Sequence, residues 1–252
     1  MKLENKYIKI VNTNYGKIVI NINDRFIGKS FSENKYWGIE DIKVISKFIE
    51  YKCKNKKKII FYDVGANIGS HTLALSKIFN NKIFIRSFEA QYTVHNMLKE
   101  TIKINNLKNI RLYHNAVSDK NGETIKIELP DYSKINNFGA LELIKPYKNS
   151  DNNLLNKDGA YEEVKTISLD SFDEEVDFIK MDIEGMEHFA LKGSKELILK
   201  YRPYLYVELR KTKKDELITF FKENKYEIYQ KGLDAFILPI ESKINITGLN
   251  KL

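Results

Sequence analysis

The sequence predicts an α/β protein in which helices cover both faces of a central, mostly parallel sheet. Short apolar runs, typical of strands that are buried on both faces, alternate with longer segments of helical periodicity. One of these runs leads through a glycine-containing loop directly into a helical segment, as in nucleotide-binding α/β folds. The 252 residues, 42% hydrophobic and 12% aromatic, suffice for one large α/β domain or two small ones and argue against disorder.

The N-terminal part of the chain predicts a β extension followed by one helix. Strand-like segments at 7–12 and 17–22 are separated by Asn-Tyr-Gly, which is typical of a hairpin turn. Apolar residues at helical spacing then predict a helix over 39–52. We therefore expect residues 1–38 to form an N-terminal β extension and residues 39–252 to form the main domain.

From residue 59 onward, strands and helices alternate. The expected strands are 59–64, 82–89, 110–117, 177–182 and 204–209, and a C-terminal hairpin of 226–230 and 233–240 completes a sheet of seven. Helices are expected at 70–79, 92–104, 185–200 and 212–224.

Residues 130–160 interrupt this alternation. They contain two prolines, two glycines and many asparagines and aspartates, without a clear periodicity. Loops of this length are often functional, so the insertion is a candidate lid over a substrate site, and a tolerated surface insertion is the alternative.

The charge and composition limit the partners and the compartment. The net charge is +8, but only five of the 42 basic residues are arginine, and the abundance of lysine, asparagine and isoleucine is typical of an A/T-rich genome, such as that of a bacterium or a large DNA virus. A nucleic-acid partner is therefore not favoured. The single cysteine excludes an internal disulfide, and neither a membrane span nor a secretory signal is visible, so we expect a soluble, cytoplasmic protein.

The segment 61–74 is a buried strand, a glycine loop and the start of a helix. Gly65 allows a sharp turn, Asn67 tolerates a left-handed conformation, and Gly69 lets a ligand approach the N–H groups of the helix. The spacing of a pyrophosphate-binding loop is absent, and Asp63 suits a ligand with a cationic amino group. Together these features predict a nucleoside cofactor that carries an amino acid.

Two further groups of acids occur at strand ends. Glu89 ends the second parallel strand, where an acid typically binds ribose hydroxyls. Lys180, Asp182 and Glu184 alternate along the fourth strand, which predicts that they share one face and line the same crevice as Asp63. An ion pair that only holds the strand end is the alternative.

These segments resemble a known family. FYDVGANIGSHTL, SFEA, NAVSD, FIKMDIEGMEHFALKG and YVEL occur in the order found in the FkbM family of class I S-adenosylmethionine-dependent methyltransferases, over roughly residues 40 to 210. The resemblance implies a Rossmann-like methyltransferase fold and S-adenosylmethionine as the cofactor. It assigns Asp63, Gly65, Asn67 and Gly69 to the methionine end, Glu89 to the ribose, Asn115 and Ala116 to the adenine, and Asp182 and Glu184 to the sulfonium.

The resulting hypothesis is an O-methyltransferase that acts on a hydroxyl of a carbohydrate, a glycan or another small metabolite. Asp182 is expected at the methyl group, Glu184 as the base, and His188 behind them. No two of the four histidines have metal-ligand spacing, so no metal site is predicted. The alternatives are an RNA ribose 2'-O-methyltransferase, which would use Lys180, Asp182 and Glu208, and an inactive cofactor-binding module. The sequence is compatible with a homo-oligomer.

Overall fold

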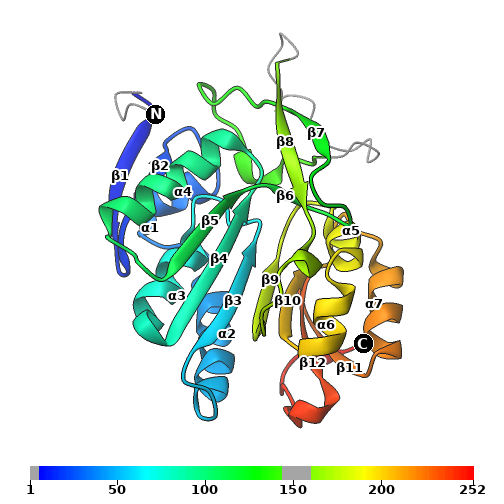
Figure 1. Ribbon diagram of the computed structural model, residues 1–252. Coiled ribbons are helices and arrows are strands. Elements are labelled where there is room, and N and C mark those ends of the chain that lie inside the picture. The colour runs from blue at the N-terminus through cyan, green and yellow to red at the C-terminus, as the bar shows by residue number, and fades with distance from the viewer. Residues whose placement is uncertain (1–5, 144–159) are drawn as a thin grey trace.

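The computed structural model describes residues 6–143 and 160–252 (Figure 1). Its central sheet has eight strands in the order β13-β11-β12-β10-β9-β3-β4-β5. Strands β10, β9, β3, β4 and β5 are paired in parallel, whereas β12, β11 and β13 join the edge next to β10 through antiparallel pairs. The strands are β3 (Ile59–Val64), β4 (Ile83–Glu89), β5 (Ile110–His114), β9 (Phe178–Met181), β10 (Tyr204–Glu208), β11 (Tyr226–Lys231), β12 (Asp234–Pro239) and β13 (Asn250–Lys251).

The predicted α/β class and the mostly parallel sheet are confirmed. The sheet has eight strands rather than seven because two residues near the C-terminus, Asn250 and Lys251, pair with β11. No helix of residues 6–143 and 160–252 is long and apolar enough to cross a membrane.

Helices cover both faces of the sheet (Figure 1). Helices α2 (Ile39–Cys53) and α3 (Ser70–Phe79) pack on one face; α5 (Glu187–Lys192), α6 (Lys195–Tyr201) and α7 (Lys214–Glu223) pack on the other. Because side chains alternate along a strand, Phe61 of β3 points towards α2 and α3, and Tyr62 points towards the opposite helices.

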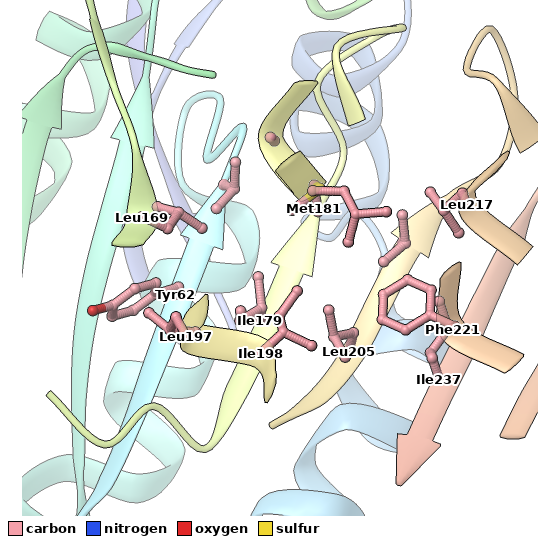
Figure 2. Packing of buried hydrophobic residues seen from close by; sticks show 14 of the residues in the cluster. Tyr62, Leu169, Ile179, Met181, Leu197, Ile198, Leu205, Leu217, Phe221 and Ile237 are labelled. Atoms are coloured by element: carbon pink, nitrogen blue, oxygen red, sulfur yellow. The ribbon is translucent and has the colours of Figure 1, made fainter. Parts of the chain in front are cut away.

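The core beneath α6 and α7 is continuous across the sheet (Figure 2). Leu197 and Ile198 of α6, together with Phe221 of α7, pack on residues such as Ile179 and Leu205 of the central strands. All five side chains are at most 3% exposed. Burying each contributes about 1.5–3 kcal/mol, so this core fixes the strands whose ends carry the polar residues described below.

The N-terminal hairpin forms as predicted, from β1 (Ile8–Thr13) and β2 (Gly16–Asn21). It lies beside α4 (Tyr92–Ile104), and the Val19 N–H donates to Thr101 Oγ1 at 3.0 Å. The extension is not entirely β, however, because Ile27–Asn34 form a helix, α1, that packs Phe31 against the hairpin.

Two predicted elements are each divided. The strand expected at 110–117 breaks at Asn115: β5 stays in the central sheet, while β6 (Ala116–Val117) pairs with β8 (Tyr161–Ile167). The sequence did not predict β8 or its antiparallel partner β7 (Thr124–Glu128).

The helix expected at 185–200 is two helices, α5 and α6, that are separated at Gly193. A Cβ atom on this glycine would lie 2.0 Å from the Ser118 carbonyl oxygen. Close contact between two backbones therefore requires glycine at this point.

Candidate functional site

A row of polar side chains crosses the carboxyl edge of the parallel strands. Asp63 of β3 lies in register between Ser87 of β4 and Lys180 of β9, and Glu208 of β10 is paired with Asp234 of β12. These neighbouring strands present them on the face that also carries α3. The carboxyl edge is where open α/β sheets bind their ligands.

A cavity of about 400 Å³ opens over this edge, within the size range of small-molecule sites. One end is formed by the glycine loop, Glu89 and residues 115–117. The other end, which we call the acidic end, is lined by five carboxylates, Asp41, Asp182, Glu184, Glu208 and Asp234. Seven predicted site residues line the cavity: Gly65, Asn67, Glu89, Asn115, Ala116, Asp182 and Glu184.

The glycine loop has the predicted backbone conformations. Gly65 and Asn67 have φ of 75° and 51°, in the left-handed region. A Cβ on Gly65 would lie 1.9 Å from the Asp182 carbonyl oxygen, so the loop touches the end of β9. Gly69, with φ of 93°, does not line the cavity; a Cβ there would lie 2.3 Å from Leu98 of α4. The left-handed φ, together with the contact with Leu98, favours glycine at this position.

Glu89 joins the loop to the start of α4. Its two carboxylate oxygens accept hydrogen bonds from the backbone N–H groups of Asn67 and Gln91, both at 2.9 Å. Burial raises the pKa of the Glu89 carboxyl to about 7, although these two donors act in the opposite direction. A carboxylate has about four acceptor sites, so two remain for hydroxyl groups of a ligand.

Asp63 lies beneath the loop rather than on the cavity wall. It is fully buried, its Oδ2 accepts from Thr72 Oγ1 at 2.6 Å, and its Oδ1 is 3.6 Å from Lys180 Nζ. Lys180 Nζ donates to the Gly65 carbonyl oxygen at 2.8 Å and also lies 3.6 Å from Asp182 Oδ2. These contacts hold the loop against β9. They correspond to the alternative interpretation of the sequence, in which an ion pair only holds the strand end.

Lys180 places a positive charge beneath the acids of the cavity. Burial acts to lower its pKa, but the carboxylates of Asp182 and Asp63 outweigh burial, so the pKa of Lys180 is raised. A buried, paired cation at this point offsets part of the negative charge of the cavity.

The acids that follow β9 do not alternate along a strand. The strand ends at Met181, and Glu184 lies in a turn with φ of 53°. This turn still brings Asp182 and Glu184 to one wall of the cavity. Asp182 is 46% exposed at its side chain, whereas Glu184 Oε2 is ion-paired with Lys211 Nζ at 2.6 Å. Burial raises the pKa of Glu184, and the Lys211 ammonium acts against this shift.

Glu208, at the end of β10, completes a group of three carboxylates. One oxygen of Asp182, of Glu184 and of Glu208 all lie within 4.8 Å of one another. Oε2 of Glu208 is buried and has no hydrogen-bond partner among the described residues. Burial and the neighbouring acids raise the pKa of Glu208 to about 9. The sequence singled out Glu208 only for the RNA alternative, because an acid at a strand end is common.

The histidines differ from expectation. His188 of α5 does not line the cavity, and burial lowers its pKa. His71 at the start of α3 does line it; the residue is buried, its Nε2 has no hydrogen-bond partner among the described residues, and burial lowers the pKa of the imidazole. From the sequence, His71 was interpreted as an ordinary polar residue, although its place beside the loop made it, with His188, one of the two histidines more open to a role as a base.

Part of the insertion forms a wall of the cavity. Asn136 pairs with Asp24 in an isolated bridge, and the Gln91 side chain donates to the Phe138 carbonyl oxygen at 3.0 Å. Farther along, Lys211 Nζ lies 3.2 Å from Glu142 Oε1. Residues 130–143 therefore connect the N-terminal extension, the start of α4 and the acidic end, while 144–159 lie outside the described residues.

A parallel sheet with a glycine loop and a buried acid at adjoining strand ends defines the Rossmann-like class of nucleotide-cofactor enzymes. The family model of the methyltransferase FkbM domain matches residues 63–228, well over half of the chain. The chain belongs to this family, and it is an S-adenosylmethionine-dependent methyltransferase.

The chain is similar to several solved structures at low sequence identity. The FkbM methyltransferase from Methylobacillus flagellatus is 17% identical, with a TM-score of 0.49 over 73% of this chain and 44% of that one, so the match spans less than half of its length. Precorrin-6y C5,15-methyltransferase from Geobacter metallireducens is 12% identical, with a TM-score of 0.42 over 79% and 86%. A putative methyltransferase from Streptococcus mutans, solved with S-adenosylhomocysteine, is 12% identical, with a TM-score of 0.42 over 73% and 88%. No curated protein matches the sequence.

Proposed function

We propose that the protein transfers a methyl group from S-adenosylmethionine to a hydroxyl of a carbohydrate or another small metabolite. The supporting observation is the composition of the cavity wall: the loop and Glu89 at one end suit a nucleoside, and the five carboxylates of the acidic end suit hydroxyl donors. S-adenosylmethionine supplies a methyl group that the sulfonium cation activates.

The cofactor is assigned to the end of the cavity that holds the glycine loop. Glu89 has free acceptor capacity for the ribose hydroxyls, and Asn115 and Ala116 line the wall proposed for the adenine. Gly65, Asn67 and Gly69 shape the loop for the methionine end, and Asp63 acts from beneath by holding Lys180. Asp182 would then face the sulfonium.

The charge of the acidic end favours a neutral or cationic acceptor over RNA. Its five carboxylates are accompanied on the cavity wall by only two basic residues, Lys180 and Arg210. A phosphate backbone requires basic contacts, so an acid-rich acceptor site works against it even in a protein of net charge +8. Residues 130–143 and the N-terminal extension are proposed to frame the acceptor.

Cofactor placement is tested by titration calorimetry with S-adenosylhomocysteine. Glu89→Ala removes a carboxylate from the cavity and should weaken binding by about 1.5–3 kcal/mol, whereas Glu223→Ala removes an exposed acid of α7 and should leave binding unchanged. Equal affinities of the two variants would show that the ribose is bound elsewhere.

The acceptor class is tested by following a radiolabelled methyl group. The protein is incubated with labelled S-adenosylmethionine and either a panel of sugars and glycosides or purified total RNA. We expect base-stable methyl ethers on a carbohydrate. Label in RNA ribose would establish the alternative instead, and cofactor binding without transfer to any acceptor would favour an inactive module.

A further inference from the structure

Glu208 is the one carboxylate of the three-acid group that has no charged partner. Lys180 lies 3.6 Å from Asp182, and Lys211 pairs with Glu184 at 2.6 Å. Within residues 6–143 and 160–252 the Glu208 carboxylate forms no ion pair, and its Oε2 is closed off from solvent and has no hydrogen-bond partner. Among the described residues, the three acids of this group are therefore matched by two paired cations, and Glu208 is the acid without one.

The surroundings of Glu208 are mostly negative. Asp182, Glu184 and Glu187 approach from the turn after β9 and from α5, Asp234 lies opposite on β12, and the nearby cations are Lys180, Arg210 and Lys211. Two of these cations are already paired with other acids. Like charges at this separation disfavour ionisation of all three carboxylates, and the unpaired one is the group that keeps a proton.

We propose that Glu208 keeps a proton in the free protein, releases it when the cationic methyl donor binds, and then receives the proton of the acceptor's hydroxyl. This inference rests on the proposed function, because it requires a sulfonium at the three-acid group. A cation nearby favours the charged form of a carboxyl by about 1–3 pKa units.

Atoms and charges balance through the cycle. On donor binding, one proton leaves Glu208 for solvent, so the new carboxylate offsets the sulfonium charge. As the acceptor oxygen forms its bond to the methyl carbon and the carbon–sulfur bond breaks, the hydroxyl proton passes to the Glu208 carboxylate. The product S-adenosylhomocysteine has no sulfonium charge, and the protein returns to its protonated starting state.

Proton release is measured by titration calorimetry of the full chain in buffers of different ionisation enthalpy. At pH 8, S-adenosylmethionine should release roughly half to one proton more than S-adenosylhomocysteine. The ratio of the S-adenosylmethionine affinity to the S-adenosylhomocysteine affinity should rise about 5- to 250-fold between pH 6 and pH 9. Groups that respond equally to both ligands cancel in this comparison.

Glu208→Gln is nearly isosteric and cannot ionise, so it should abolish the difference in proton release while binding S-adenosylhomocysteine as the parent protein does. Glu223→Gln on the exposed side of α7 is the matched control and should keep the difference. Persistence of the release in Glu208→Gln, or equal release with both ligands in the parent protein, would overturn the assignment.

A second variant covers the case in which Glu208→Gln does not fold. Asp234→Asn removes one negative neighbour, so the pH range of the release should move to lower pH; an unchanged range would also overturn the proposal. If neither ligand binds the parent protein, the proposed function fails. If both bind without a difference in protons, this inference alone fails.

Discussion

Replacing Glu89 by glutamine measures how much an ionised carboxylate in the cavity wall lowers the free energy of unfolding. Glu89 is 7% exposed, and burial raises its pKa from 4.5 to about 7. Each pKa unit corresponds to 1.36 kcal/mol, so a rise of the pKa from 4.5 to about 7 amounts to roughly 3 kcal/mol. Since the folded state holds the proton more tightly than the unfolded state, this stabilising contribution is complete below pH 4.5 and is lost as the pH rises through 7.

The expected result is a pH-dependent difference in the free energy of unfolding. Relative to Glu89→Gln, which stays neutral, the parent protein should lose about 3 kcal/mol of stability between pH 4 and pH 8. Urea unfolding at a series of pH values measures this change, and Glu223→Gln controls for the removal of an acid. A parent–variant difference that varies by less than about 1 kcal/mol over this range would refute the reasoning.

Two further predictions concern the loop. Lys180→Met should destabilise the protein by about 3–5 kcal/mol, because it leaves Asp63 buried without its cation. Adding Asp63→Asn to this variant should recover part of the lost stability. If the losses in the free energy of unfolding of the two single variants, measured in urea, simply add up in the double variant, the two residues are not coupled and the argument is contradicted. Gly65→Ala should lower both the melting temperature and the S-adenosylhomocysteine affinity far more than Gly122→Ala does. Both glycines have positive φ, but only at Gly65 would the new Cβ meet backbone, so equal effects would contradict the steric argument.

The regular elements of the central sheet were predictable because their periodicity is strong. β3 and α3 have the predicted bounds, β4 and β10 differ from them by one residue at one end, and β9 is one residue shorter at each end. β7 and β8 were missed since their strands are largely exposed, with Ile127 and Val164 among the few buried residues. The small sheet that they form with β6 depends on pairing between distant segments, which local periodicity does not encode.

The sequence predicted which residues form the site better than it predicted how their side chains are arranged. The sequence located Asp63 at a strand end, but only the fold shows that its side chain lies under the helix that begins at Ser70. It treated Glu184 as a residue of the strand, whereas the left-handed turn sets the direction of its side chain. The acids at the ends of β10 and β12 came together through an antiparallel pair, and no motif in the sequence marks that contact.

The strand order has a consequence for how the chain folds during synthesis. β3 lies between β4, which follows closely in the chain, and β9, whose Lys180 bonds to the Gly65 carbonyl 115 residues earlier. Until β9 has been synthesised, β3 therefore has an open edge, and the Asp63 carboxylate has no cation beside it. A nascent or truncated chain that ends before β9 should stay prone to pairing with other chains, so the central sheet closes only late in translation.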